Sequence, residues 1–123
     1  MRLLLDTHVT IWLSYEPNRV PDRVGEAIAH ADEVFASVIS GWEYEQKRNK
    51  HGVALPRPFP ELVRALLLSP LAFAFDCHAY AASLPPIHAD PFDRMLIAQA
   101  LHHDLTLVTI DLVIRDYPVE TLW

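Results

Sequence analysis

The stretch Arg2-Leu3-Leu4-Leu5-Asp6-Thr7-His8 decides the fold of this chain. Three successive leucines are typical of a strand that is buried on both faces, as in a parallel sheet covered by helices. Asp6 would then lie at the carboxyl end of that strand, where open α/β sheets form their ligand-binding crevice. Asp6 also suits the N-cap of a helix that begins near Thr7, so this stretch alone leaves both roles open.

Length and composition fit a single folded domain over residues 1–123. Of the 123 residues, 51% are hydrophobic, so the chain can bury a core without disulfides or a structural metal. The one cysteine, Cys77, excludes an internal disulfide framework and a multi-cysteine zinc site, which favours a cytoplasmic location. The apolar runs are too short for a secretory signal or a membrane span, so no membrane association is expected.

The net charge of −6 argues against nucleic-acid binding that is driven by a basic surface. It does not exclude nucleic acid as a substrate, because carboxylates that hold a divalent cation make a site acidic until the metal arrives. A metal-dependent nuclease is therefore compatible with this composition.

Helix and strand patterns alternate along the chain. Helices are expected at residues 7–16, 21–31, 38–50, 60–68, 77–84 and 90–103, and strands at 3–5, 34–37, 71–75, 105–109 and 119–122. The segment Gly52–Pro60 is interpreted as a loop because it contains three of the ten prolines. This order predicts an α/β fold with a parallel sheet of about four to five strands between layers of helices.

Glu43 lies in the helix that follows the predicted strand 34–37. Ser40 and Glu43 match the spacing of a capping box, in which each side chain bonds the other's backbone amide, so a structural role for Glu43 is open. Glu45 lies nearly opposite Glu43 on a helix, and we expect it to face solvent.

Three more acidic positions lie at a predicted helix start or after a predicted strand. Asp90, with Pro91 at the first helical position, suits a helix N-cap, while Asp93 in the first turn can reach a crevice. Asp111 follows the strand 105–109 after one residue, Ile110, and the alternative there is a solvated loop aspartate.

A divalent-cation site would explain why these carboxylates are all expected at one edge of a sheet. Mg²⁺ and Mn²⁺ prefer carboxylate and water oxygens, and crowded carboxylates without a cation repel one another and take up protons. Of the seven histidines only His8 and His88 lie near the predicted edge. No predicted helix carries a His-x-x-x-His pair, so zinc is not expected.

Four segments carry a family resemblance. They are Leu3–Asp6 with the following Thr-His, Ser40–Glu43, His88–Ala100 (HADPFDRMLIAQA) and Leu105–Asp111 (LTLVTID). They resemble the PIN-domain nucleases, and most closely the VapC-like toxins of toxin–antitoxin pairs. The resemblance implies a PIN-like three-layer sandwich and a Mg²⁺- or Mn²⁺-dependent endoribonuclease that cleaves RNA by attack of a metal-activated water. It also implies a homodimer and a cognate antitoxin protein.

The same resemblance assigns residue roles. It implies four catalytic and metal-binding carboxylates, Asp6, Glu43, Asp93 and Asp111. Asp90 matches a further acid that can join the metal site, and Thr7 and Thr109 match small hydroxyl residues beside the pocket.

Two other classes of protein fit the same carboxylates. One is a non-catalytic binding module, whose acidic pocket receives a basic side chain from a partner protein. The other is a phosphotransfer domain with Asp6 as its nucleophile. Phosphatases of that type usually carry a second aspartate two residues later, where this chain has His8.

Aromatic and basic side chains offer further candidate contacts to RNA. Trp12, Trp42 and Tyr44 could stack on bases, although packing in the core or in a dimer interface is the expected role. Five basic residues form a candidate phosphate-binding rim: Lys47, Arg48, Lys50, Arg57 and Arg64. A solvated helix end explains the first three nearly as well.

Overall fold

A computed structural model describes residues 1–51 and 55–123. Its strands are β1 (Arg2–Leu5), β2 (Glu33–Ser37), β3 (Ser69–Leu71), β4 (Thr106–Val108) and β5 (Thr121–Leu122). Its α-helices are α1 (Thr7–Tyr15), α2 (Asp22–His30), α3 (Val38–His51), α4 (Phe59–Ala65), α5 (Cys77–Ser83) and α6 (Pro91–His103). Two 3₁₀ helices, η1 (Pro17–Arg19) and η2 (Leu112–Asp116), complete the set.

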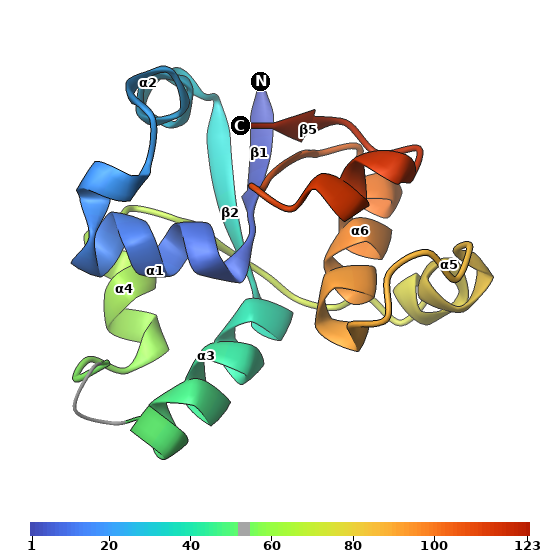
Figure 1. Cartoon of the computed structure of the whole chain (residues 1–123), viewed down its shortest axis with the longest axis horizontal. Coiled ribbons are helices and arrows are strands. Elements are labelled where there is room, and N and C mark those ends of the chain that lie inside the picture. The colour runs from blue at the N-terminus through green and yellow to red at the C-terminus, as the bar shows by residue number, and fades with distance from the viewer. Residues whose placement is uncertain (52–54) are drawn as a thin grey trace.

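The five strands form one parallel sheet in the order β3-β2-β1-β4-β5. The leucines of the central strand β1 alternate between two apolar clusters, as the period-2 geometry of a strand requires. Leu3 and Leu5 pack into the cluster that includes Val9 of α1, whereas Leu4 packs into the cluster that includes Ile97 of α6. Helices α1, α2 and α4 lie on one side of β1 and β2, and α5 and α6 lie on the other (Figure 1). The predicted three-layer α/β sandwich is confirmed.

The third strand lies earlier than predicted. β3 covers Ser69–Leu71, so the predicted strand 71–75 is wrong beyond its first residue. Pro70 is tolerated because β3 is an edge strand, where a missing N–H leaves no ladder bond unmade. The chain then leaves the sheet, and the Ala72 carbonyl accepts a hydrogen bond from the Gln99 side chain at 3.3 Å.

The predicted loop Gly52–Pro60 is shorter than expected. Residues 52–54 of that segment lie outside the described part, residues 55–58 form neither helix nor strand, and α4 begins at Phe59. Gly41 of α3 allows a close approach to α4, since a Cβ on Gly41 would lie 3.0 Å from the Phe59 ring. None of the described helices has the length and apolarity that a bilayer span needs.

The register of the sheet brings the residues that follow its strands close together at one edge. Leu5 of β1 pairs with Val108 of β4, and the Asp6 amide donates to the Val108 carbonyl at 2.9 Å. The chain segments that follow β1, β2 and β4 therefore begin side by side. Asp6 and Thr109, more than one hundred positions apart in the sequence, become direct neighbours.

Candidate active site

Asp6 is buried at the carboxyl end of β1, with only 4% of its surface exposed. Its Oδ1 accepts the His8 amide at 3.1 Å, which caps α1, and its Oδ2 accepts the Thr109 hydroxyl at 2.6 Å. Burial raises the pKa of Asp6, but hydrogen bonds from His8 and Thr109 outweigh it and hold the pKa below its ordinary value. Asp6 is therefore a fixed, ionised carboxylate and not only a helix cap.

Thr109 connects Asp6 to Asp111. The Thr109 hydroxyl oxygen accepts the Asp111 amide at 3.1 Å while its proton goes to Asp6. Asp111 caps η2, because its Oδ1 accepts the Val113 amide at 2.9 Å. Its Oδ2 lies 2.7 Å from Nε2 of His88. Both carboxylate oxygens are engaged, so the alternative of a merely solvated loop aspartate is wrong for Asp111.

His88 joins Asp111 to Asp93. The ring Nδ1 accepts the Asp90 amide at 3.1 Å, which places the ring proton of neutral His88 on Nε2. That nitrogen lies 2.7 Å from Asp111 Oδ2 and 3.1 Å from Asp93 Oδ2. Ligand atoms of these three residues lie within 4.8 Å of one another, a spacing that could hold a metal ion. Sequence reasoning placed His88 near this edge but gave it no role.

Asp93 is the carboxyl group most strongly affected by crowding. Burial together with the charges of Asp6 and Asp90 raises its pKa to about 7, with a smaller contribution from Glu43, while His88 opposes this rise. Asp93 therefore carries a proton below about pH 7 when no cation is present. A divalent cation would relieve this repulsion, so the donor set fits the metal that the sequence resemblance implies.

Glu43 does not belong to a capping box. Helix α3 begins at Val38, and its first turn is capped by Ser37, whose Oγ accepts the Ile39 amide at 2.9 Å. The Ser40 hydroxyl instead accepts the Thr7 hydroxyl at 2.9 Å, inside the protein. The capping-box alternative is therefore wrong. Glu43 is a 9%-exposed carboxylate whose charge contributes to the raised pKa of Asp93, and it lines one groove together with Asp90.

Glu45 has a structural role that the sequence did not indicate. Its Oε2 accepts the Phe59 amide at 3.1 Å, and its Oε1 accepts a 3.5 Å bond from Arg48. The expectation that Glu45 simply faces solvent is wrong, because the side chain ties α3 to the first residue of α4. Asp90 behaves as predicted, since its Oδ1 caps α6 by accepting the Phe92 amide at 2.8 Å.

Arg94 and Tyr117 form a support that sequence reasoning missed. The Arg94 guanidinium donates to the carbonyls of Ala81, Leu84 and Pro85 at 3.0, 3.1 and 2.9 Å. The Tyr117 hydroxyl accepts the His88 amide at 2.7 Å. The sequence signal for this support is an arginine directly after Asp93, in a first helical turn where acidic residues are preferred.

Of the three aromatic candidates for RNA contacts, two are buried and one is exposed. Trp12 and Tyr44 belong to the core, as expected for packing residues. Trp42 is 57% exposed, and its ring meets the Phe92 ring edge-on with a centroid distance of 5.3 Å.

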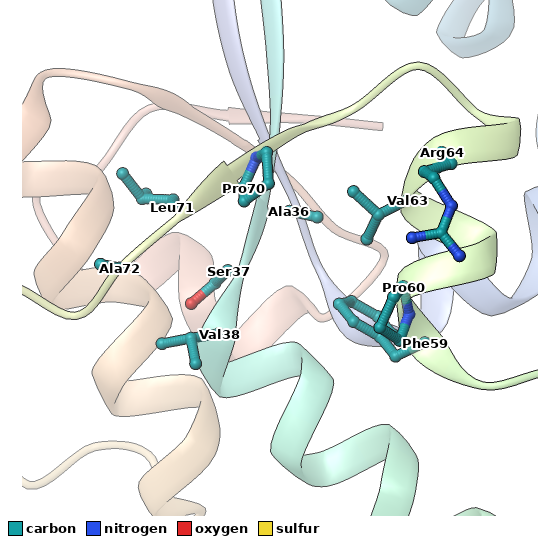
Figure 2. A pocket seen from close by; sticks show the side chains of 10 residues that line it. All are labelled: Ala36, Ser37, Val38, Phe59, Pro60, Val63, Arg64, Pro70, Leu71 and Ala72. Carbon is teal, nitrogen blue, oxygen red and sulfur yellow. The ribbon is translucent and has the colours of Figure 1, made fainter.

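A separate hollow of about 420 Å³ lies between the start of α3, α4 and β3. Figure 2 shows it lined by apolar side chains that include Val38, Phe59 and Leu71, with Arg64 at its rim. The Ser37 hydroxyl at its wall donates to Gln99 inside the protein. None of the described residues that line this hollow is a carboxylate, so it is distinct from the acidic site.

Comparisons with known proteins agree with this fold. The chain is 36% identical to Ribonuclease VapC22 of Mycobacterium tuberculosis, over 98% of each chain. Its structure resembles that of VapBC from Salmonella typhimurium bound to DNA, with a TM-score of 0.75, 18% identity and coverage of 99% and 97%. It also resembles VapBC2 from Rickettsia felis bound to a promoter fragment, with a TM-score of 0.72, 18% identity and coverage of 100% and 99%.

A protein-family model also matches this chain. The PIN domain model matches residues 3–120, which include all five carboxylates of the site. The parallel sheet and the acids at its carboxyl edge agree with that match. This chain belongs to the PIN domain family.

Proposed function

We propose that this protein is a Mg²⁺- or Mn²⁺-dependent endoribonuclease and the toxin of a toxin–antitoxin pair. The observation that carries the proposal is the linked set of carboxylates at the sheet edge, in which Asp6, Asp111 and Asp93 are connected through Thr109 and His88. The name of the 36%-identical relative, Ribonuclease VapC22, supports RNA as the substrate.

Each carboxylate has a part in this proposal. Asp6 and Asp93 are the leading metal ligands, Asp111 completes the second position, and Glu43 binds metal or orients the attacking water. Asp90 adds negative charge from the N-cap of α6. A bound divalent cation would bind the scissile phosphate and lower the pKa of a water. The protein fixes the acceptors beforehand, because hydrogen bonds from Thr109 and His88 leave their oxygens little freedom.

Partner proteins are part of the same proposal. Both similar solved structures named above are VapBC assemblies, which supports a cognate antitoxin for this chain. We also propose a homodimer in the cytoplasm. Val38 and Trp42, one helical turn apart on α3, expose apolar surface that such contacts would cover.

The test of the proposal is RNA cleavage by the purified protein, freed of antitoxin, in Mg²⁺, Mn²⁺ or EDTA. We expect cleavage with either metal and none in EDTA, because EDTA removes the divalent cation that would bind the scissile phosphate. Asp6→Asn, with its fold checked by circular dichroism, is the control for a contaminating ribonuclease and should not cleave. A folded wild-type protein that neither binds metal nor cleaves any RNA would favour the non-catalytic binding module.

His88 is expected to orient the carboxylates through its Nε2 proton. His88→Ala should weaken Mn²⁺ binding about 10- to 100-fold, the usual cost of losing an outer hydrogen bond to a metal ligand. His88→Gln places an amide N–H near the same position and should retain most of the affinity. Isothermal titration with Mn²⁺ measures both variants. An equal loss in His88→Gln would contradict the orienting role and indicate that the imidazole itself binds the metal.

A further inference from the structure

A polar groove of about 660 Å³ adjoins the carboxylates. It runs between α3 and the start of α6, and its lining residues are Glu43, Gln46, Lys47, Lys50 and residues 89–92. The chain contains two lysines in all, and both line this groove. We propose that Lys47 and Lys50 bind backbone phosphates of a single-stranded RNA next to the phosphate that is cleaved. This inference rests on the proposed ribonuclease function.

The lining of the groove is acidic at one end and basic at the other. Glu43, Lys47 and Lys50 follow one another at helical spacing on α3, so they share one face of the helix. The 1.5 Å rise per residue places Lys47 about 6 Å and Lys50 about 10 Å beyond Glu43 along the axis. The carboxylate end can hold a cation, and the lysine end can hold the following phosphates. The volume is in the range of pockets that hold a small ligand.

Among the described residues, two arginines of the candidate rim already have partners within the protein, whereas the two lysines are free to bind a ligand. Arg48 is engaged by Glu45 and the Pro56 carbonyl, and Arg57 donates to the Ser14 carbonyl and stacks on Tyr15. Within residues 1–51 and 55–123, no carboxylate lies within ion-pair distance of Lys47 or Lys50. Their charges are therefore available to a ligand.

The groove favours nucleic acid over an acidic peptide. Phe92 and Pro91 supply an apolar wall beside the lysines, and basic grooves with aromatic walls are typical of single-strand binding. A substrate that enters here also reaches Glu43 and Asp90, which are part of the proposed active site. An acidic segment of a partner protein could bind the lysines, but it has no bases to stack on Phe92.

The test measures how salt affects RNA binding. A fluorescent single-stranded RNA is titrated in Ca²⁺, so that binding is read without turnover, at salt concentrations from 50 to 400 mM. Lys47→Met/Lys50→Met should weaken binding roughly 10- to 30-fold at 0.1 M salt and reduce the slope of log K against log salt by about 1.4, for two lost single-strand phosphate contacts. Lys47→Arg/Lys50→Arg should restore both values. Arg19→Met/Arg23→Met removes the same charge from η1 and α2, outside the groove and outside the candidate rim, and should change the slope little.

The possible outcomes distinguish a failure of this inference from a failure of the proposed ribonuclease function. An unchanged slope in the lysine variant, while the wild type cleaves RNA, overturns the inference and leaves the ribonuclease intact. A lysine-dependent slope without cleavage in Mg²⁺ or Mn²⁺ supports RNA phosphate binding by the two lysines and overturns the proposed activity. No RNA binding by the wild type overturns both. If the lysine variant loses binding to a glutamate-rich peptide but not to RNA, the groove serves a protein partner instead.

Discussion

Asp93→Asn is expected to stabilise the metal-free protein at pH 8 and to abolish RNA cleavage. Its pKa of about 7 in the folded state exceeds the ordinary value of 3.8 because burial and the charges of Asp6 and Asp90 disfavour its ionised form. Between those values the folded state binds a proton that the unfolded state has lost. The free energy of unfolding therefore falls as pH rises from about 4 to about 7, and the destabilisation is complete above pH 7.

The size of this effect follows from the shift in pKa. One pKa unit corresponds to about 1.4 kcal/mol, so the full shift would cost about 4 kcal/mol. Because Asp93 retains contact with water, we expect about half of that, or about 2 kcal/mol. Asparagine keeps the shape without the charge, so the melting temperature at pH 8 should rise by about 6–10 °C. Cleavage should fall about 10²- to 10³-fold, the scale of removing one group that stabilises transition-state charge.

Asp6→Asn is the matched comparison. The two Asp6 oxygens accept hydrogen bonds from the His8 amide and the Thr109 hydroxyl, and these bonds lower its pKa. An amide offers only one acceptor oxygen, so one donor is left unpaired. At pH 5, where Asp93 is mostly protonated, Asp6→Asn should lower the free energy of unfolding by about 1–3 kcal/mol, while Asp93→Asn should be nearly neutral.

Thermal melts of both variants in EDTA at pH 5 and pH 8, paired with cleavage assays in Mn²⁺, provide the measurement. Loss of cleavage in both variants with opposite effects on stability would assign the two carboxylates different electrostatic environments in one site. Destabilisation of Asp93→Asn at pH 8 would contradict the crowding argument. Adding Mn²⁺ to the wild type at pH 8 should produce much of the rise in melting temperature that is expected for Asp93→Asn, because a bound cation removes the same repulsion.

The backbone of this site could be predicted from the sequence because its signals are local. The buried strand at Leu3–Leu5, the helix N-caps at Asp6 and Asp90 and the strand before Asp111 each follow from a few adjacent residues. Parallel pairing then brings the carboxyl ends of β1 and β4 together without further information. The position of β3 was missed because Pro70 is a breaker signal in most strands and is tolerated only at the edge of a sheet.

The side-chain connections could not be predicted, because they join residues that are distant in sequence. The Ser40 and Glu43 spacing looked like a capping box, yet Ser37 caps α3 and Ser40 bonds Thr7. The choice depends on where α3 begins, and a shift of three residues changes the cap completely. His88 gave no distinctive local signal, since its partners Asp93 and Asp111 meet it only after α6 and η2 pack against the sheet.

Arg94→Lys is expected to destabilise the fold, although Arg94 is not one of the carboxylates of the site. Arg94 donates to three backbone carbonyls, those of Ala81, Leu84 and Pro85, and to the Tyr117 hydroxyl. A lysine keeps the charge but cannot reach these acceptors with one ammonium group. We expect the free energy of unfolding to fall by about 2–3 kcal/mol in urea titrations. Arg64→Lys, on the exposed face of α4, is the control and should change it by less than about 0.5 kcal/mol.

The same substitution should weaken metal binding, although Arg94 touches no carboxylate oxygen in the structure. Arg94 and Tyr117 both hold the Pro85 carbonyl, and Tyr117 also holds the His88 amide, so together they fix the segment that presents His88. Arg94→Lys and Tyr117→Phe should each lower Mn²⁺ affinity about tenfold. Because they act on one segment, the double variant should lose much less than the product of the single losses. Fully additive losses would mean that the two residues stabilise the fold separately and do not position His88 together.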